Sequence, residues 1–268
     1  MSSYLLNAPG GPLAGAVLGF AHRGGGRADE NTLAAFTAAA AHGFAYLETD
    51  VRLSSDGVLY AIHDATVDRV TNGTGAVAEL SAAELDALTV HGPAGEPPAR
   101  FETLLRELPH ARWNVDVKSD GAADELVRLV AEAGAQDRVL VASFVAAHRR
   151  RAQALLPSMA GSAGPWLVAA SVLLGPLAVP LLKRARARGI VALQVPVRQY
   201  GIRVVRAAWV RRLHAAGVQA HVWVVDDPEQ MRELIGLGVD GLMTDEPALL
   251  AAVLGERGEW PQLQGERA

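Results

Sequence analysis

Two carboxylates and one imidazole lie close together in residues 45–64, AYLETDVRLSSDGVLYAIHD. Glu48 and Asp50 are two positions apart in a run typical of a β-strand, so their side chains share one face of it. The sequence SSDG at 54–57 predicts a tight turn, and the run after it ends at His63. We therefore expect a hairpin that brings these three side chains near one edge of a sheet.

The two carboxylates need a physical explanation, because like charges on one strand face repel unless a cation lies between them. Leu47 and Val51 flank them and predict a strand that is buried on both faces, where ionised carboxylates need partners. Carboxylate oxygens are ligands that suit Ca²⁺, Mg²⁺ or Mn²⁺. The pair thus indicates a divalent-cation site, whereas the simpler interpretation is a solvated strand face.

The composition is that of an ordinary soluble protein. The chain has 268 residues, of which 50% are hydrophobic and 20% charged, with a net charge of −4 and no cysteine. The basic excess typical of nucleic-acid binding is missing, so no nucleic-acid partner is expected. Disulfides, thiolate metal sites and a cysteine nucleophile are excluded. The first residues, MSSYLLNAPGGPLAGAV, do not resemble a signal peptide, and we expect a cytoplasmic protein.

Strand and helix patterns alternate along the chain. Runs typical of strands lie at 17–22, 45–51, 112–118, 139–144, 158–162, 190–195, 218–225 and 241–244. A helical pattern or helical insertion follows each run, which predicts a single-domain TIM (β/α)₈ barrel with a core at about 17–254. An open doubly wound sheet is the alternative, but the glycines at 24–26 lack the spacing of a nucleotide-binding fingerprint.

Two segments depart from the alternation of strands and helices. Residues 65–99, with a Gly- and Pro-rich end, predict a small insertion after the second barrel strand, placed near the barrel mouth. The polar tail from Gly255 is expected to fray.

The carboxyl ends of the strands are the place where a barrel of this kind has its active site. Polar side chains of several chemistries fall at or near these ends: His22, Arg23, Glu48, Asp50, His63, Asp116, Lys118, Gln194, Trp223, Thr244 and Asp245. A structural role could explain any one of them, but hardly all of them together. Their convergence predicts an active site.

Four stretches resemble the motifs of the glycerophosphodiester phosphodiesterase family: HRGGGRADENTLAAF, ETDVRLSSDGVLYAIHDATVDRVTNGTG, NVDVKSD and GVDGLMTDEP. The resemblance runs over nearly the whole chain, with the motifs in the family's order. It implies a TIM barrel with a small insertion after the second strand. The implied activity is metal-dependent hydrolysis of a small-molecule glycerophosphodiester to glycerol 3-phosphate and an alcohol.

The resemblance also implies roles for the catalytic residues. His22 and His63 resemble the family's general acid–base pair, and imidazole suits both tasks near neutral pH. We expect His63 to be the acid and His22 the base. Arg23 resembles the phosphate-binding arginine, whose guanidinium can bind two phosphate oxygens at once.

Metal ligands and further substrate contacts follow from the same resemblance. Glu48 and Asp50 resemble metal ligands for a divalent cation, Ca²⁺ or Mg²⁺. Asp116 stands where the family usually has a glutamate, so a water could bridge the shorter side chain to the ion. Lys118 matches a lysine of the family that contacts substrate, and Trp223 matches a residue that lines the pocket.

The apolar segment 166–182 raises the question of whether the protein contacts a membrane. A helix of this length is about 26 Å long, short of a hydrocarbon core of about 30 Å, and Gly175, Pro176 and Pro180 would break it. We interpret the segment as a buried or lid-like helical region. Weak contact with a membrane surface is the alternative.

Two other functions remain open from the sequence. The first is a phospholipase D-like enzyme that acts on lysophospholipids or sphingolipids, and the second is a non-catalytic barrel that binds phosphoesters. The preferred alcohol, the attacking group (water or the substrate's own hydroxyl) and the oligomeric state are not determined by these patterns.

Overall fold

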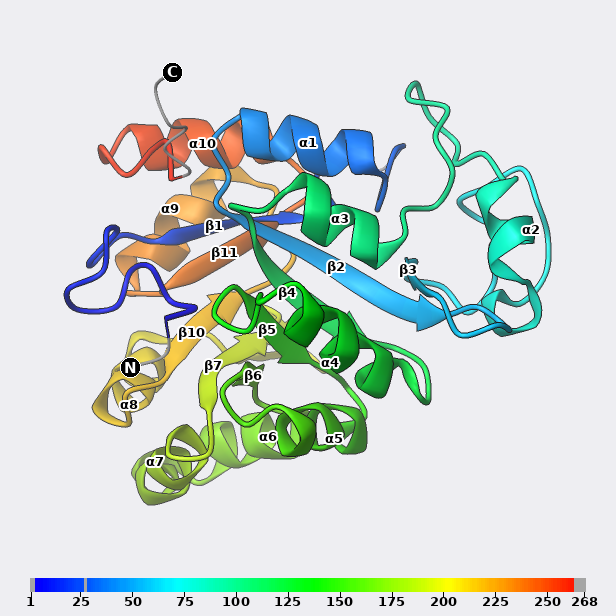
Figure 1. The fold of residues 1–268 in the computed structure, drawn as a ribbon. Helices are drawn as coiled ribbons and strands as arrows, with labels where there is room; N and C mark the ends of the chain where they lie inside the picture. The colour runs from blue at the N-terminus through cyan, green and yellow to red at the C-terminus, as the bar shows by residue number, and fades with distance from the viewer. Residues whose placement is uncertain (1–2, 27, 263–268) are drawn as a thin grey trace.

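Eight parallel strands close into a barrel in the computed structural model, which describes residues 3–26 and 28–262 (Figure 1). The barrel strands are β1 (Leu18–His22), β2 (Tyr46–Leu53), β4 (Arg112–Val117), β5 (Val139–Ala142), β6 (Ala160–Ser162), β7 (Ile190–Val195), β10 (Gln219–Val222) and β11 (Gly241–Thr244). The first strand, β1, pairs in parallel with both β2 and β11, which closes the sheet. The predicted TIM barrel is confirmed and the open sheet is excluded.

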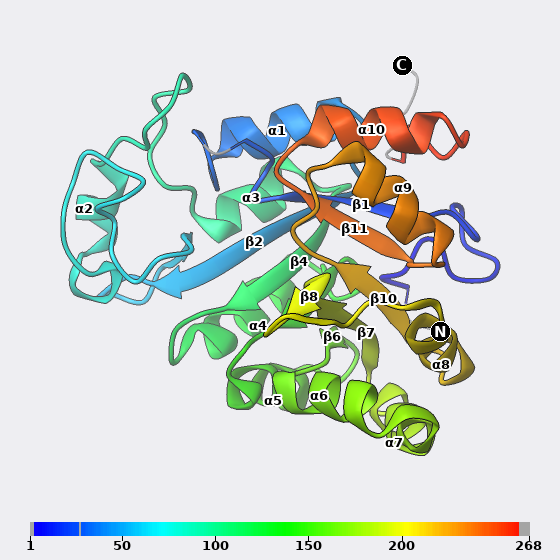
Figure 2. The same cartoon turned by 180° about the vertical axis from the view of Figure 1, so that it is seen from behind.

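Helices surround the barrel between successive strands (Figures 1 and 2). They are α1 (Leu33–Ala41), α3 (Phe101–Glu107), α4 (Ala122–Glu132), α5 (Ala146–Leu155), α6 (Pro165–Leu173), α7 (Val179–Arg186), α8 (Ala207–Ala215), α9 (Pro228–Gly236) and α10 (Pro247–Gly255). Local sequence fixes several starts: Thr32 caps α1 by accepting a hydrogen bond from the Ala35 amide, and Asp227 caps α9 just before Pro228.

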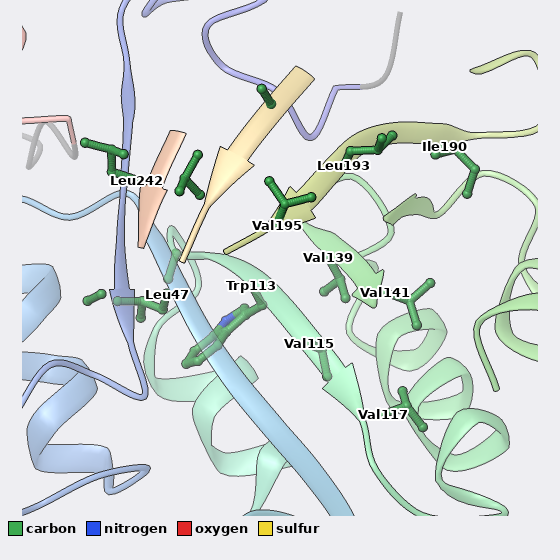
Figure 3. Close-up of a cluster of buried hydrophobic side chains, with 14 of the residues drawn as sticks. Leu47, Trp113, Val115, Val117, Val139, Val141, Ile190, Leu193, Val195 and Leu242 are labelled. Atoms are coloured by element: carbon green, nitrogen blue, oxygen red, sulfur yellow. The ribbon is translucent and has the colours of Figure 1, made fainter. Parts of the chain in front are cut away.

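Side chains along each barrel strand point alternately to an outer apolar layer and to the barrel interior. Side chains of the outer layer pack between strands and helices, and Figure 3 labels ten of them: Leu47, Trp113, Val115, Val117, Val139, Val141, Ile190, Leu193, Val195 and Leu242. Because successive side chains point to opposite faces, Glu48, Asp50, Asn114 and Asp116 face the interior. The burial of the outer layer thus fixes the direction of the polar residues.

The amino-terminal end of the barrel interior is filled by a second apolar cluster. Phe20 and Tyr46 pack there, at a distance of 4.8 Å between ring centroids. The segment before β1 covers them, since the Tyr46 hydroxyl donates to the Tyr4 carbonyl at 2.6 Å. Substrate can therefore enter only from the opposite end, where the strands finish.

The insertion folds at the carboxyl end of β2 (Figure 1). It follows β3 (Leu59–Ala61), which pairs antiparallel with β2 as the predicted hairpin. The insertion contains a short 3₁₀ turn, η1 (Val77–Glu79), and α2 (Ala82–Asp86). A small apolar cluster of its own, built on Tyr60, Val67 and Leu85, holds it together. Its place near the barrel mouth agrees with the prediction.

The apolar segment 166–182 is neither one helix nor wholly buried. Gly175 and Pro176 end α6 and begin a 3₁₀ turn, η2 (Gly175–Ala178), before α7. Leu182 is buried, as predicted, whereas Leu173 and Leu177 are each 79% exposed. Within residues 3–26 and 28–262, no helix is both long and apolar enough to cross a membrane.

Two further features differ from expectation. A short hairpin of β8 (Arg198–Gln199) and β9 (Ile202–Arg203) follows β7 and was not predicted. The tail after Gly255 is anchored rather than frayed as far as residue 262. Gln262 accepts a hydrogen bond from the Gly19 amide at 2.9 Å and donates to the Val17 carbonyl. Residues 263–268 lie outside the described part of the chain.

Candidate active site

A cavity of about 740 Å³ opens at the carboxyl ends of the barrel strands. All eight residues to which the family resemblance assigned a role line it: His22, Arg23, Glu48, Asp50, His63, Asp116, Lys118 and Trp223. Gln194 also lines it. Thr244 and Asp245, also placed at a strand end by the sequence, do not line it. A cavity of this size, with mostly apolar lining and a few convergent charged groups, is the usual form of a small-molecule site.

The turn after β1 directs Arg23 over the cavity. Arg23 has a positive φ of 53°, and Gly24 follows with φ of 89°. A side chain at Gly24 would approach the Ala35 Cβ to 2.8 Å, so the turn requires glycine there. The Arg23 amide donates to the Glu48 carbonyl at 2.9 Å, which fixes the turn against β2. A left-handed non-glycine residue is a conformation that surrounding contacts must hold.

His22 lies between two carboxylates. Its Nδ1 is 2.6 Å from Asp245 Oδ1, and its Nε2 is 3.7 Å from Glu48 Oε2. Burial alone would lower the pKa of His22, but the charge of Glu48 and the hydrogen bond with Asp245 raise it above its ordinary value. Asp245 was noted at a strand end without a role, and the structure makes it the partner that orients His22.

His63 has a matching carboxylate partner. Its Nδ1 is 2.7 Å from Asp64 Oδ1, which leaves Nε2 for the cavity. The Arg69 guanidinium, from the insertion, binds the other Asp64 oxygen at 2.5 Å. This hydrogen bond from Arg69, opposed by burial, lowers the pKa of Asp64 to about 2, so the carboxylate stays ionised beside His63.

Glu30 connects this group to Arg23. Its carboxylate accepts two hydrogen bonds from Arg69, at 2.7 and 2.9 Å, and one from Arg23 at 3.2 Å. The Glu30 side chain is buried, so its charge depends on these two guanidinium groups. No role was predicted for Glu30 or Arg69, although both lie in stretches that carry the family resemblance.

The predicted metal ligands lie on neighbouring strands. Asp50 on β2 is paired in register with Asp116 on β4. The Lys118 ammonium lies between them, 3.0 Å from Asp50 Oδ1 and 2.6 Å from Asp116 Oδ2. Burial opposes the charge of Lys118, but the two aspartates raise its pKa overall. Burial, and then the charge of Asp50, raises the pKa of Glu48 well above its ordinary value.

The carboxylate group is short of positive partners. Glu48 Oε2, Asp50 Oδ2 and Asp116 Oδ1 are buried and make no hydrogen bond within the described residues, although Asp50 Oδ2 lies 3.1 Å from Arg23 Nε in an ion pair. Buried carboxylate oxygens of this kind need a cation or a donor, so this donor set fits a hard divalent ion. However, the described side chains do not form a ready-made cluster of three metal-ligating groups. Lys118 occupies the space between two of the three acids.

Asn114 is a residue of the barrel interior that sequence reasoning missed. It lies beside Glu48 in the strand register and accepts a hydrogen bond from Gln194 at 3.0 Å, across the barrel. It is the first residue of the NVDVKSD stretch, but the sequence indicated no role for it, because only the closed barrel brings β4 opposite β7. Among the histidines of the described chain, only His22 and His63 line the cavity. His91, in the insertion, does not line it.

A sequence model of the glycerophosphoryl diester phosphodiesterase family matches residues 22–249. The chain belongs to this family. It is 39% identical over 249 residues to a Mycobacterium tuberculosis protein named probable glycerophosphodiester phosphodiesterase 2, covering 92% of this chain and 94% of that one. A glycerophosphodiester phosphodiesterase of Caldanaerobacter subterraneus subsp. tengcongensis is 30% identical over 254 residues, covering 87% and 96%.

Solved structures show the same architecture as this member of the family. The crystal structure of the glycerophosphodiester phosphodiesterase from Agrobacterium tumefaciens superposes with a TM-score of 0.71 at 29% identity, covering 88% of this chain and 99% of that one. An Oleispira antarctica phosphodiesterase, solved with its product sn-glycerol-3-phosphate, shares the fold at a TM-score of 0.73 and 22% identity, with coverages of 90% and 97%. The chain is thus a phosphoric diester hydrolase, as its motifs implied.

Proposed function

We propose that this cavity hydrolyses glycerophosphodiesters to glycerol 3-phosphate and an alcohol, with the help of a divalent cation and the pair His22 and His63. The observation that carries the proposal is that two aspartate-paired histidines, two basic side chains and three carboxylates line one cavity. Each group has a separate task in the cleavage of an anionic diester.

Phosphate binding falls to the two basic side chains. Arg23 and Lys118 both line the cavity and both keep their positive charge against carboxylates. The guanidinium fork of Arg23 can bind two phosphate oxygens at once, while Lys118 acts as a point charge. Together they would hold the diester with its phosphorus atom between the two histidines.

A divalent cation would be held by Glu48, Asp50 and Asp116, whose unbonded oxygens support this assignment. When bound, it would supply positive charge at the phosphate and stabilise the charge that develops during attack. The carboxylates favour Ca²⁺, Mg²⁺ or Mn²⁺ over soft metals.

Proton transfer falls to the two histidines. His22 is the more buried and would take the proton from the attacking oxygen as it bonds to phosphorus. If that oxygen belongs to the substrate's own hydroxyl rather than to water, a water must afterwards open the cyclic phosphate to give glycerol 3-phosphate. His63, whose side chain is 37% exposed, would return a proton to the alcohol as the bond between phosphorus and the alcohol oxygen breaks. Asp245 and Asp64 hold the two rings so that each Nε2 faces the substrate.

The proposed function is tested by incubating the protein with glycerophosphocholine and measuring both products of cleavage. We expect equal amounts of glycerol 3-phosphate and choline, and we expect His22→Ala and His63→Ala each to lower kcat by roughly 10²–10⁴. His110→Ala changes an exposed histidine outside the cavity and serves as the control. Release of glycerol and phosphocholine instead, or full activity of both histidine variants, would refute the proposal.

A further inference from the structure

The cavity has two chemically different sides. The charged groups come from β1, β2, β4 and the β2–β3 hairpin, and they gather around the site of phosphate attack. The opposite side is built by α6, by the segment of the β8–β9 hairpin and by Phe144 and Trp223. Figure 2 shows β8 on the same side of the barrel as α6, and both line the one cavity.

The α6 helix offers only hydrocarbon to the cavity. Its cavity-lining residues recur at the spacing of one helical face: Pro165, Val168, Ala169, Val172 and Leu173. The helix is fixed by its other face, where Leu167 is buried and the buried Ser171 hydroxyl accepts a hydrogen bond from the Trp209 indole at 2.9 Å. The apolar face toward the cavity is therefore not needed to attach α6 to the barrel.

The hairpin extends this apolar wall to the cavity mouth. Tyr200 and Ile202 line the cavity and are 94% and 55% exposed. Tyr200 has a left-handed φ of 49° and Gly201 follows at 77°, so this two-residue turn would suit Asn or Gly better than a tyrosine. The turn itself thus gives no reason for an aromatic ring at its tip.

Exposed apolar side chains surround the same mouth. Leu173 lines the cavity and is 79% exposed, and Trp166, about two turns earlier on α6, is 70% exposed. Exposed apolar surface that is continuous with a binding cavity marks a site for an apolar ligand. We call this surface the apolar wall: Phe144, the cavity face of α6, Tyr200, Ile202 and Val204.

A deacylated glycerophosphodiester would gain little binding free energy from contact with the apolar wall. Its hydroxyl and charged groups would lose hydrogen bonds to water on contact with hydrocarbon, and the wall has no polar side chain on α6 to replace them. A hydrocarbon chain, in contrast, gains free energy from each methylene that leaves water. The wall begins beside the phosphate site, because the Lys118 ammonium lies 5.3 Å from the centre of the Phe144 ring.

We propose that the substrates of this site are single-chain glycerophosphodiesters, whose hydrocarbon chain lies along the apolar wall while the phosphate is held by Arg23 and Lys118. The inference rests on the proposed function, since the bond that is cleaved is the same. The chain can be attached to the glycerol or to the head group, because both arms of the diester begin at the phosphate.

The test compares diesters that differ only in chain length. Glycerophosphoethanolamine without a chain is measured beside two series with short to medium acyl chains, one acylated on the glycerol and one on the ethanolamine nitrogen, all below their micelle concentrations. Release of the phosphate monoester is the readout. We expect kcat/KM to rise about three- to fourfold per added methylene, until the wall is covered, in at least one series.

The outcomes separate the inference from the proposed function. If glycerophosphoethanolamine is cleaved and no diester of either series has a higher kcat/KM than it, the inference is wrong and the proposed function stands. If no diester is cleaved with any divalent cation present, both are wrong. A rise in the glycerol series or in the ethanolamine series supports the inference and identifies the arm that carries the chain.

A matched pair of variants locates the chain. Leu173→Gln places an amide on the wall, and because Leu173 is largely exposed, its loss removes little buried surface. We expect the ratio of kcat/KM between the chain-bearing and chainless diesters to fall at least tenfold. Leu155→Gln changes an exposed leucine at the end of α5, outside the cavity, and should leave the ratio unchanged. An equal ratio in both variants would overturn the placement on α6.

Discussion

His22 and His63 are each bonded through Nδ1 to an aspartate, and this shared arrangement decides what each ring can do. A carboxylate acceptor holds the hydrogen on Nδ1 and turns Nε2 toward the cavity. The two histidines then differ in their surroundings: His22 also faces Glu48 at 3.7 Å, whereas the side chain of His63 is more exposed. The proposed division into base and acid rests on this difference.

The division of roles predicts different responses to the leaving group. A diester with nitrophenolate as its leaving group needs little protonation, because that anion is stable. His63→Ala should therefore recover much of its lost kcat on this diester, while His22→Ala should not. Parallel rate measurements on the activated and the natural diester provide the check. Equal recovery in both variants, or in neither, would contradict the assignment.

Asp50 forms ion pairs with both basic side chains of the cavity. Its carboxylate lies 3.1 Å from Arg23 and 3.0 Å from Lys118, and one of its oxygens makes no hydrogen bond. Asp50→Asn keeps the shape but removes the charge, so we expect kcat/KM to fall by at least about a hundredfold with the fold retained. Asp124→Asn, at an exposed position of α4, is the control and should stay active. An active Asp50→Asn would count against the proposed cation site.

At the scale of elements, the insertion contributes to the site through Arg69. The Arg69 guanidinium donates hydrogen bonds to Asp64, the partner of His63, and to Glu30, the partner of Arg23. It therefore positions two cavity residues without lining the cavity itself.

Arg69→Lys tests this role of the insertion. Lysine keeps the charge but cannot bond two carboxylates with a planar fork, so kcat should fall roughly tenfold. The pH dependence of kcat should also shift, because the carboxylate beside His63 loses its partner. Arg100→Lys changes another insertion-side arginine, paired with Asp86, and should leave both quantities unchanged. Equal effects of the two changes would show that Arg69 acts only through stability.

Sequence patterns predicted those elements whose signal is local. The strand runs, the hairpin at 54–57 and the residues at strand ends follow from alternation and turn chemistry. The pairs His22–Asp245 and Arg69–Glu30 join distant parts of the chain, and no pattern of spacing reveals them. Likewise, the apolar run at 166–182 predicted helix correctly but did not show which face of α6 would meet the cavity.

The whole molecule places a titratable group at the centre of the barrel. His221 is fully buried, and its Nε2 is 2.9 Å from Gln219 Oε1 while its Nδ1 makes no hydrogen bond within the described residues. Burial lowers its pKa to about 4. His221 is thus an interior histidine with only one of its two ring nitrogens hydrogen-bonded within the described residues.

This burial predicts loss of stability in mild acid. The unfolded chain binds a proton at His221 below about pH 6.5, but the folded chain does so only near pH 4. The free energy of unfolding should therefore fall by about 3 kcal/mol between those pH values from this group alone. Denaturant unfolding of wild type and His221→Gln across that range measures the difference. An unchanged pH dependence in the variant would contradict the prediction.

His214 should change the free energy of unfolding with pH in the opposite direction to His221. Its Nε2 is 2.8 Å from Asp240 Oδ2, and this hydrogen bond raises its pKa above 6.5 although burial opposes it. Its contribution is fully present below pH 6.5 and is lost as the pH rises through the raised value. His214→Gln should thus weaken the fold more at pH 6 than at pH 9. A larger loss at pH 9 would be inconsistent with the ion pair.

The proposed mechanism requires the buried carboxylates at the barrel mouth to bind a divalent cation on which hydrolysis depends. Its most direct test is glycerol 3-phosphate release from glycerophosphocholine by protein stripped with EDTA, followed by separate additions of Ca²⁺, Mg²⁺ and Mn²⁺. We expect turnover to vanish on chelation and to return with at least one of these ions. Full turnover by the stripped protein would contradict this requirement.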